Sequence, residues 1–252
     1  MISHDEQVDR QFGPVAAAYL TSAVHSQGAD LIKAGETLRG VAAVLDVGCG
    51  AGHLSFAVAP HVGSIVASDL SPDMLAAVDA EARRRGLANL RTTRASAEAL
   101  PFPDAHFDAV CTRFSAHHWN DLERGIAEMR RVLKASGQLI VIDIVAPESA
   151  LLDTHLQALE LLRDASHVRD YRMTEWAVTL ERAGFGIVAT ERWPLRMEFD
   201  TWVARMKTPA DKIAVLRSML KHAPREVREH FKVDDDASFD IEAAMFECRA
   251  AE

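Results

Sequence analysis

The residues best suited to do chemistry gather in one glycine-rich segment. Three glycines, Gly48, Gly50 and Gly52, follow a short apolar stretch that contains Asp46. Glycine allows a tight turn and lets a ligand approach the backbone without meeting a Cβ atom. A second carboxylate, Asp69, ends the next apolar run, at about the spacing where an acidic residue meets ribose hydroxyls in nucleotide-binding βαβ units. Together these features predict a site for a nucleoside-type cofactor.

The glycine spacing narrows the kind of ligand. A dinucleotide-binding dehydrogenase would show G-x-G-x-x-G, but His53 stands where the third glycine would be. The Gly-Lys-Ser/Thr ending of a phosphate-binding loop is missing as well. A glycine-rich turn without any ligand is the alternative, and the preceding strand together with Asp69 disfavours it.

The composition limits the partners. The formal net charge is -9, which argues against nucleic acid or an anionic membrane surface, because both favour basic proteins. A small molecule is the expected ligand. The polar N-terminus and the lack of a long apolar stretch predict a cytoplasmic protein without a membrane span. Cys49, Cys111 and Cys248 lie far apart, so we expect neither a disulfide framework nor a metal site.

Elements that position these residues follow an alternating pattern. Strands are expected near 42–47, 64–69, 89–93, 107–112 and 138–144, and helices near 52–60, 72–85 and 120–134. Such alternation predicts a parallel sheet with helices on both faces. Ser71-Pro72 is typical of a helix N-cap followed by proline at the first helical position, and Ser136-Gly137 is typical of a helix end.

The segments on either side of this core are expected to cover it. Spacing from about Phe12 to Ala34 predicts an amphipathic helix before the first strand. Beyond Pro147 we expect helices near 149–163 and 174–183, a strand from Gly186 to Arg196, further helices and a last strand near 239–248. Because no linker separates the parts, we expect one domain: a helical cover (1–40), a cofactor-binding core (41–146), and lid helices with completing strands (147–252).

Several motifs in order resemble a known enzyme family. The segment from Val44 to Gly52 resembles the first motif of the class I S-adenosylmethionine-dependent methyltransferases, and Ala67 to Leu75 resembles their second strand and following helix. Ala97 to Phe102 and Arg131 to Leu139 resemble their later loops, although Ala135-Ser136 replaces the usual Pro-Gly. The resemblance implies a Rossmann-like, doubly wound α/β fold with a seven-stranded, mostly parallel sheet, an antiparallel last strand and a helical lid.

Within that family the chain is similar to the ubiquinone and menaquinone biosynthesis-type methyltransferases. This closer likeness rests on the blocks Ser115 to Trp119, Arg163 to Arg169 and Trp202 to Met206. Phe12 to Tyr19 also resembles the opening of malonyl-acyl-carrier-protein methyltransferases. The expected activity is methyl transfer from S-adenosylmethionine to a small-molecule acceptor, leaving S-adenosylhomocysteine. The alternatives are a non-catalytic cofactor-binding module and a methyltransferase acting on an acyl-carrier or carboxyl oxygen.

The resemblance also implies roles for individual residues. Asp46 would contact the cofactor's ammonium group, Asp69 its ribose, and the helix N-terminus after Gly52 its carboxylate. The remaining expected cofactor contacts are Gly48, Cys49, Gly50, Leu70, Met74, Ser96, Ala97, Arg113, Phe12 and Tyr19. The aromatic rings of Phe12 and Tyr19 would lie over the sulfonium, but their helical spacing fits packing in the core equally well.

The acceptor side of the site is predicted from residue type and position. His117 and His118 follow the fourth strand, where a base would lie, and histidine titrates in the right range. A loop or helix-capping role is their alternative. His167 and Arg169 lie between two lid helices and are candidates to hold a carboxylate or enolate, with a solvated helix end as the alternative. A homodimer is compatible with the sequence.

Overall fold

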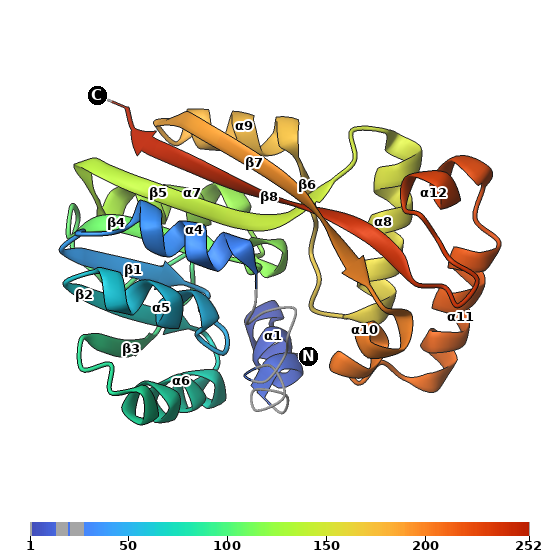
Figure 1. Ribbon diagram of the computed structural model, residues 1–252, viewed down its shortest axis with the longest axis horizontal. Coiled ribbons are helices and arrows are strands. Elements are labelled where there is room, and N and C mark those ends of the chain that lie inside the picture. The colour runs from blue at the N-terminus through green and yellow to red at the C-terminus, as the bar shows by residue number, and fades with distance from the viewer. Residues whose placement is uncertain (1, 14–19, 21–27, 252) are drawn as a thin grey trace.

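One mixed sheet runs through the computed structural model, which describes residues 2–13, 20 and 28–251 (Figure 1). Its strands are β1 (Ala43–Val47), β2 (Ser64–Asp69), β3 (Leu90–Arg94), β4 (Phe107–Arg113), β5 (Leu133–Ala146), β6 (Tyr171–Arg172), β7 (Phe185–Met197) and β8 (Phe239–Ala250). They lie in the order β3-β2-β1-β4-β5-β8-β7, with β6 beside β5. Among the strand pairs of the described residues, only those that β8 makes with β5 and β7 are antiparallel. The expected fold is confirmed, and the two-residue strand β6 brings the sheet to eight strands rather than seven.

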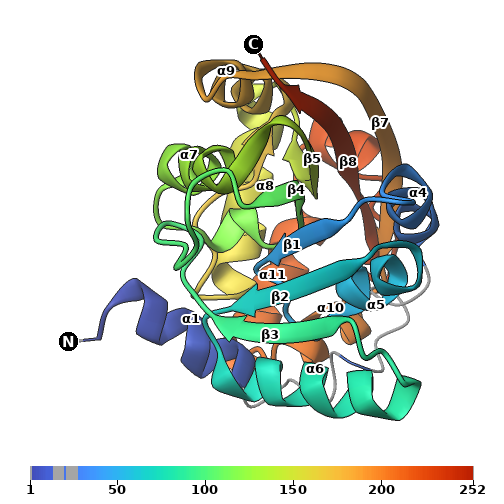
Figure 2. The same ribbon diagram turned by 90° about the vertical axis from the view of Figure 1, so that its left-hand side faces the viewer.

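Helices cover both faces of this sheet (Figure 2). The α-helices of the described residues are α1 (His4–Phe12), α4 (Ala29–Thr37), α5 (His53–Val58), α6 (Pro72–Arg85), α7 (Leu122–Val132), α8 (Ala150–Arg163), α9 (Met173–Arg182), α10 (Phe199–Arg205), α11 (Ala210–Lys221) and α12 (Arg225–His230). None of the described helices is both long enough and apolar enough to cross a bilayer.

Alternation along the central strand β5 explains the two layers. Leu139 and Val141 pack into a core with α7 and α9, whereas Ile140 and Ile142 pack into another core with α4, α5 and α6. Successive side chains of a strand point to opposite faces, so a run that is apolar at every position predicts burial on both sides. The continuous apolar character of this strand therefore places it in the middle of the molecule.

A third core holds the lid together at one end of the sheet (Figure 1). Trp202 of α10, Leu159 of α8 and Leu220 of α11 pack there against Phe239 at the start of β8. Trp202 and Phe239 meet edge to face, with ring centroids 5.0 Å apart. The long antiparallel strands β7 and β8 thus belong to the sheet at one end and to the lid at the other.

Two local predictions needed correction or fall outside the description. The helix expected to end at Ser136-Gly137 ends at Val132 instead, because Leu133 already pairs with Phe107 in the sheet. The expected helix from Phe12 to Ala34 lies mostly on residues 14–19 and 21–27, outside the described residues; helix α1 precedes them and α4 follows them.

Candidate active site

The carboxyl ends of three parallel strands form the floor of the site. Strands β1, β2 and β4 run in parallel, so the loops after Val47, Asp69 and Arg113 meet at one edge of the sheet. A cavity of about 1030 Å³ opens at this edge. We call it the first cavity.

Asp69 is anchored at the floor of the first cavity by two backbone amides. Gly50 donates its N–H to Oδ2 over 2.8 Å, and Ser71 donates to Oδ1 over 2.9 Å. Burial nevertheless raises the pKa of Asp69 above its ordinary value. Each carboxylate oxygen keeps a further lone pair, so the side chain is fixed in place and still able to accept hydrogen bonds from a ligand.

Asp46 is the more deeply buried of the two acids. Ser55 donates its hydroxyl to Oδ2 over 2.6 Å, but Oδ1 has no hydrogen-bond partner among the described residues. Burial raises the pKa of Asp46 to about 7. Ser71 also lines this cavity, and its buried hydroxyl has no hydrogen-bond partner among the described residues. Ser71 is the N-cap of α6, as the sequence predicts, but its side chain makes no capping hydrogen bond. Two such atoms on residues that line one cavity favour a ligand there, which would supply the missing hydrogen bonds.

Most of the predicted cofactor residues line this one cavity. They are Phe12, Asp46, Gly48, Cys49, Gly50, Asp69, Leu70, Met74, Ser96, Ala97 and Arg113. Gly52 belongs to the glycine loop but does not line the cavity. Tyr19 lies outside the described residues. Buried Arg113 forms an ion pair with Asp30 of α4, so its guanidinium ties two elements together.

A second cavity of about 570 Å³ lies under the lid and shares three lining residues with the first. Phe12, Phe114 and His118 line both cavities, so these three side chains mark the junction. His118 and Phe12 meet edge to face, with ring centroids 4.8 Å apart. Helix α1 lies across the junction, where Gln11 donates a hydrogen bond to the Met206 carbonyl of the lid.

His117 is held by a carboxylate at the wall of the second cavity. Its Nδ1 lies 2.5 Å from Oδ1 of Asp143, and Asp143 also accepts the backbone N–H of Ala116 over 2.9 Å. Burial alone would lower the pKa of His117, but attraction and hydrogen bonding to Asp143 outweigh it and raise the pKa to about 9. The sequence offered one signal for this partner, a lone acid within the apolar run of β5.

His118 has the opposite character. Its Nδ1 lies 3.1 Å from the Ser166 carbonyl, which can only accept, so Nδ1 carries the hydrogen and Nε2 is left as an acceptor. Burial, reinforced by the neighbouring charge of His117, lowers the pKa of His118. The two adjacent histidines, with ring centroids 4.2 Å apart, therefore favour different protonation states.

Comparison with known proteins decides the family. Residues 45–141 match the family model described as "Methyltransferase domain". YafE of Escherichia coli is 40% identical over 79% of this chain and 97% of its own length. The uncharacterized methyltransferase YcgJ of Bacillus subtilis is 35% identical over 87% and 88%, and its crystal structure superposes with a TM-score of 0.83 at 32% identity over 88% of this chain and 98% of that one. The chain belongs to the class I S-adenosylmethionine-dependent methyltransferases.

Likeness to the quinone-modifying members of the family is narrower. A ubiquinone/menaquinone biosynthesis C-methyltransferase of Marinomonas is 36% identical over 43% of this chain and 45% of its own length. The match thus leaves out more than half of each protein. The acceptor of this methyltransferase therefore does not follow from that likeness.

Two predicted substrate residues of the methyltransferase line neither cavity. Arg169 lies 2.9 Å from Asp153 and 3.1 Å from Glu175, so its guanidinium is engaged in ion pairs. His167 is buried behind the second cavity, where its Nε2 lies 3.0 Å from Oε1 of Gln157. The expected contact of these two side chains with a carboxylate or enolate finds no support in these positions.

The lid of the methyltransferase supplies residues that the sequence did not single out. Asp170, Glu160, Arg163, Arg205, Ile144, Leu195, Met197 and Ile241 all line the second cavity. They come from α8, α10, strand β5, both long C-terminal strands and the loop before β6. No local pattern predicts that these elements approach one another. Within the described part of the chain, no group of histidine, cysteine and acidic side chains could hold a metal ion.

Proposed function

We propose that the enzyme transfers a methyl group from S-adenosylmethionine in the first cavity to a small-molecule acceptor in the second. One observation carries this: the two cavities share Phe12, Phe114 and His118 as lining residues, with the acidic glycine loop on one side and the lid on the other. In-line displacement needs the two reactants in such an end-to-end arrangement. When bound, the cofactor supplies the methyl group on a positively charged sulfur.

The polar atoms of the first cavity fit this cofactor. Asp46 Oδ1 lacks a partner and suits the ammonium group, while the amide-anchored carboxylate of Asp69 suits the ribose hydroxyls. Leu70 and Met74 supply apolar surface for the adenine ring, and Phe12 supplies an aromatic face near the junction. These assignments follow from the chemistry of each group.

His117 and His118 are proposed to serve the acceptor. His117, fixed through Nδ1 by Asp143, keeps Nε2 to remove a proton from the acceptor when its ring is neutral. His118, fixed through Nδ1 by the Ser166 carbonyl, keeps Nε2 to accept a hydrogen bond at the junction. Little other acid–base machinery is needed, because the methyl donor is already activated.

Labelled cofactor tests this function. S-adenosylmethionine carrying an isotopic methyl group would be supplied with a panel of phenols, quinols, alcohols and carboxylic acids, and calorimetry would measure cofactor affinity separately. We expect cofactor binding and label transfer to at least one small acceptor. Absence of both binding and transfer would refute the proposal, and transfer only to an acyl-carrier protein would replace the small-molecule acceptor.

A further inference from the structure

Asp170 has a buried carboxyl group whose Oδ2 accepts no hydrogen bond from the described residues. The residue is 1% exposed and lines the second cavity. Its Oδ2 has no hydrogen-bond partner among the described residues, and the nearest ring nitrogen, Nε2 of His167, lies 3.9 Å away. That distance is beyond hydrogen-bond range. A buried, unsatisfied carboxyl at a cavity wall calls for a partner supplied from outside the protein.

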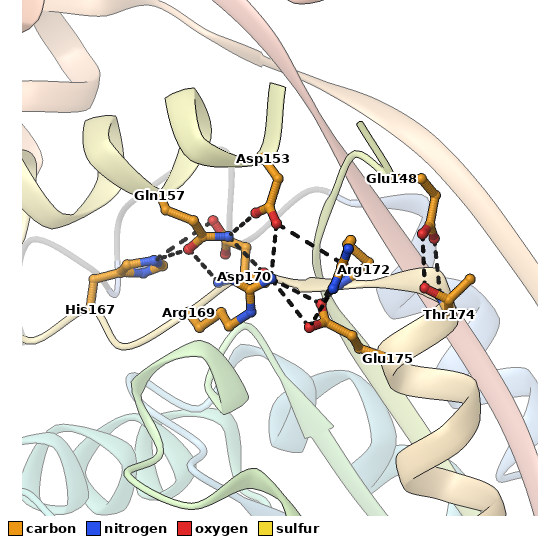
Figure 3. Close-up of polar contacts among 9 residues, drawn as sticks. All are labelled: Glu148, Asp153, Gln157, His167, Arg169, Asp170, Arg172, Thr174 and Glu175. Atoms are coloured by element: carbon orange, nitrogen blue, oxygen red, sulfur yellow. Dashed lines mark hydrogen bonds and ion pairs between the residues drawn. The ribbon is translucent and has the colours of Figure 1, made fainter. Parts of the chain in front are cut away.

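Hydrogen bonds hold the backbone of Asp170 in place, whereas its Oδ2 accepts none from the described residues. Gln157 of α8 accepts the Asp170 N–H over 3.0 Å and donates to the Asp170 carbonyl over 2.8 Å (Figure 3). The same amide accepts from Nε2 of His167 over 3.0 Å and donates to Asp153 over 2.9 Å. Four hydrogen bonds are the full capacity of a glutamine amide, so its position is fixed.

An outer layer of ion pairs keeps Gln157 in place. Asp153 lies 2.9 Å from Arg169, and Glu175 of α9 lies 3.1 Å from Arg169 and 3.0 Å from Arg172 (Figure 3). Although burial raises the pKa of Glu175, hydrogen bonds from Arg172 and then Arg169 lower it to about 2, so the carboxylate stays charged. The whole network joins α8, the loop before β6 and α9 around one backbone position.

Charges around Asp170 disfavour a charged acceptor. Arg163 and Glu160 of this cavity form an ion pair with each other over 2.7 Å. A cationic amine would still meet Arg205 and His117, which favours its charged form, and an anion would meet the carboxyl group of Asp170 itself. A neutral molecule avoids both penalties. A hydroxyl group can donate or accept, so it pairs with a carboxyl group in either protonation state.

We propose that Asp170 is a specificity-determining residue that hydrogen-bonds a hydroxyl group on an uncharged, largely apolar acceptor, and that Gln157 is its positioning residue. The apolar remainder of the acceptor would pack against Leu195, Met197 and Ile241. This inference rests on the proposed function, because it takes the second cavity as the acceptor site. Arg169 then acts at a distance, through Asp153 and Gln157.

Four small probes of one shape test the inference: benzyl alcohol, toluene, benzoate and benzylammonium. Ligand-observed NMR would measure their binding to the full chain saturated with S-adenosylhomocysteine. We expect benzyl alcohol to bind about tenfold more tightly than toluene, the value of one hydrogen bond to a buried group, and more tightly than both ions. Asp170→Leu and Gln157→Leu should each abolish the preference for the alcohol over toluene.

Two controls separate recognition from folding. Met197→Leu, a change of similar volume in the apolar wall, should alter all four affinities together and leave the alcohol preference intact. In the unmodified protein, benzyl alcohol but not toluene should shift the 13Cγ resonance of Asp170, identified by its loss in Asp170→Asn. This second readout stands even where the leucine variants do not fold.

The outcomes separate this inference from the proposed function. An unchanged alcohol preference in folded Asp170→Leu, an unmoved carboxyl resonance, tightest binding of benzoate or benzylammonium, or no binding of any probe would each overturn the role of Asp170. Failure of S-adenosylhomocysteine to bind in calorimetry would instead count against the proposed function.

Discussion

Asp69 is the side chain whose removal best isolates the cofactor proposal at the scale of single residues. It accepts two backbone hydrogen bonds within the first cavity. We expect Asp69→Ala to weaken binding of S-adenosylhomocysteine by about 1–3 kcal/mol, the value of one or two lost hydrogen bonds to a charged group. Calorimetry measures this, with exposed Asp211→Ala as the control. Equal affinity in the wild type and Asp69→Ala would refute contact with the ribose.

His117 sets the expected pH dependence of methyl transfer. Its neutral form, which can take a proton, becomes populated as the pH rises through its pKa of about 9. The rate with any acceptor that takes up label should therefore rise from pH 7 through pH 9 and level off about one pH unit above this pKa. Asp143→Asn removes the attraction that raises this pKa, so the rise should move to lower pH while the maximal rate falls about 100-fold. A flat profile across this range in the wild type would contradict the role of His117.

At the scale of elements, Gly52 shows what the glycine loop requires of its residues. Gly52 has a φ of 85°, and a Cβ there would lie 2.9 Å from both Phe56 and Val78. Gly40 has a similar φ of 83° but nothing within 4 Å of a Cβ. Gly40→Ala should therefore cost about 1 kcal/mol for backbone strain, and Gly52→Ala about 2–4 kcal/mol because of the added collision.

Urea denaturation of the two glycine variants measures the difference. Equal losses of stability would mean that backbone conformation alone explains the glycine at position 52. A larger loss for Gly52→Ala would mean that the packing of α5 on α6 holds the loop close to the sheet, since Phe56 and Val78 belong to these helices.

Helix α4 offers a second test at the element scale. Its Asp30 forms an ion pair with Arg113 of β4, and both side chains are at most 5% exposed. Asp30→Ala should destabilise the fold by about 3–5 kcal/mol, because removing one partner leaves an uncompensated buried charge. Lys33 of the same helix pairs with Glu191 and is 38% exposed, so Lys33→Ala should cost less than about 1 kcal/mol. Similar losses of unfolding free energy in both variants would contradict this.

Across the whole molecule, buried histidines tie stability to pH. Burial, with repulsion from His117 and His118, lowers the pKa of His167 to about 2. The unfolded chain binds a proton at this residue below about pH 6.5 and the folded chain does not, so this contribution to stability is lost as the pH falls. Between pH 6.5 and 5 the wild type should lose about 2 kcal/mol more than His167→Gln. Urea titrations at the two pH values measure the free energy of unfolding. Equal losses in the wild type and His167→Gln would refute this prediction.

The cofactor half of the site was largely predictable because its determinants are local. A glycine loop after one strand and an acid at the end of the next lie at the same edge of any parallel sheet, so short motifs were enough to place Asp46, Gly50 and Asp69. The prediction of a helix end was wrong where strand pairing overrides the local sequence pattern. Ser136-Gly137 looks like a helix end, yet the sheet already recruits the chain from Leu133.

The sequence by itself determined the fold class and indicated the residues of the proposed cofactor site, since both follow from strand–helix periodicity and glycine spacing. Only the tertiary structure brought together the residues of the proposed acceptor site. His117 and Asp143 lie 26 positions apart in the chain and are hydrogen-bonded. Gln157, on helix α8 of the lid, donates a hydrogen bond to the backbone of Asp170. Arg169, a plausible substrate ligand by type and position, is instead taken up by Asp153 and Glu175. Each of these pairings requires two side chains to come within about 3 Å of each other in the folded chain. The spacing of residues along the sequence does not show which side chains come that close.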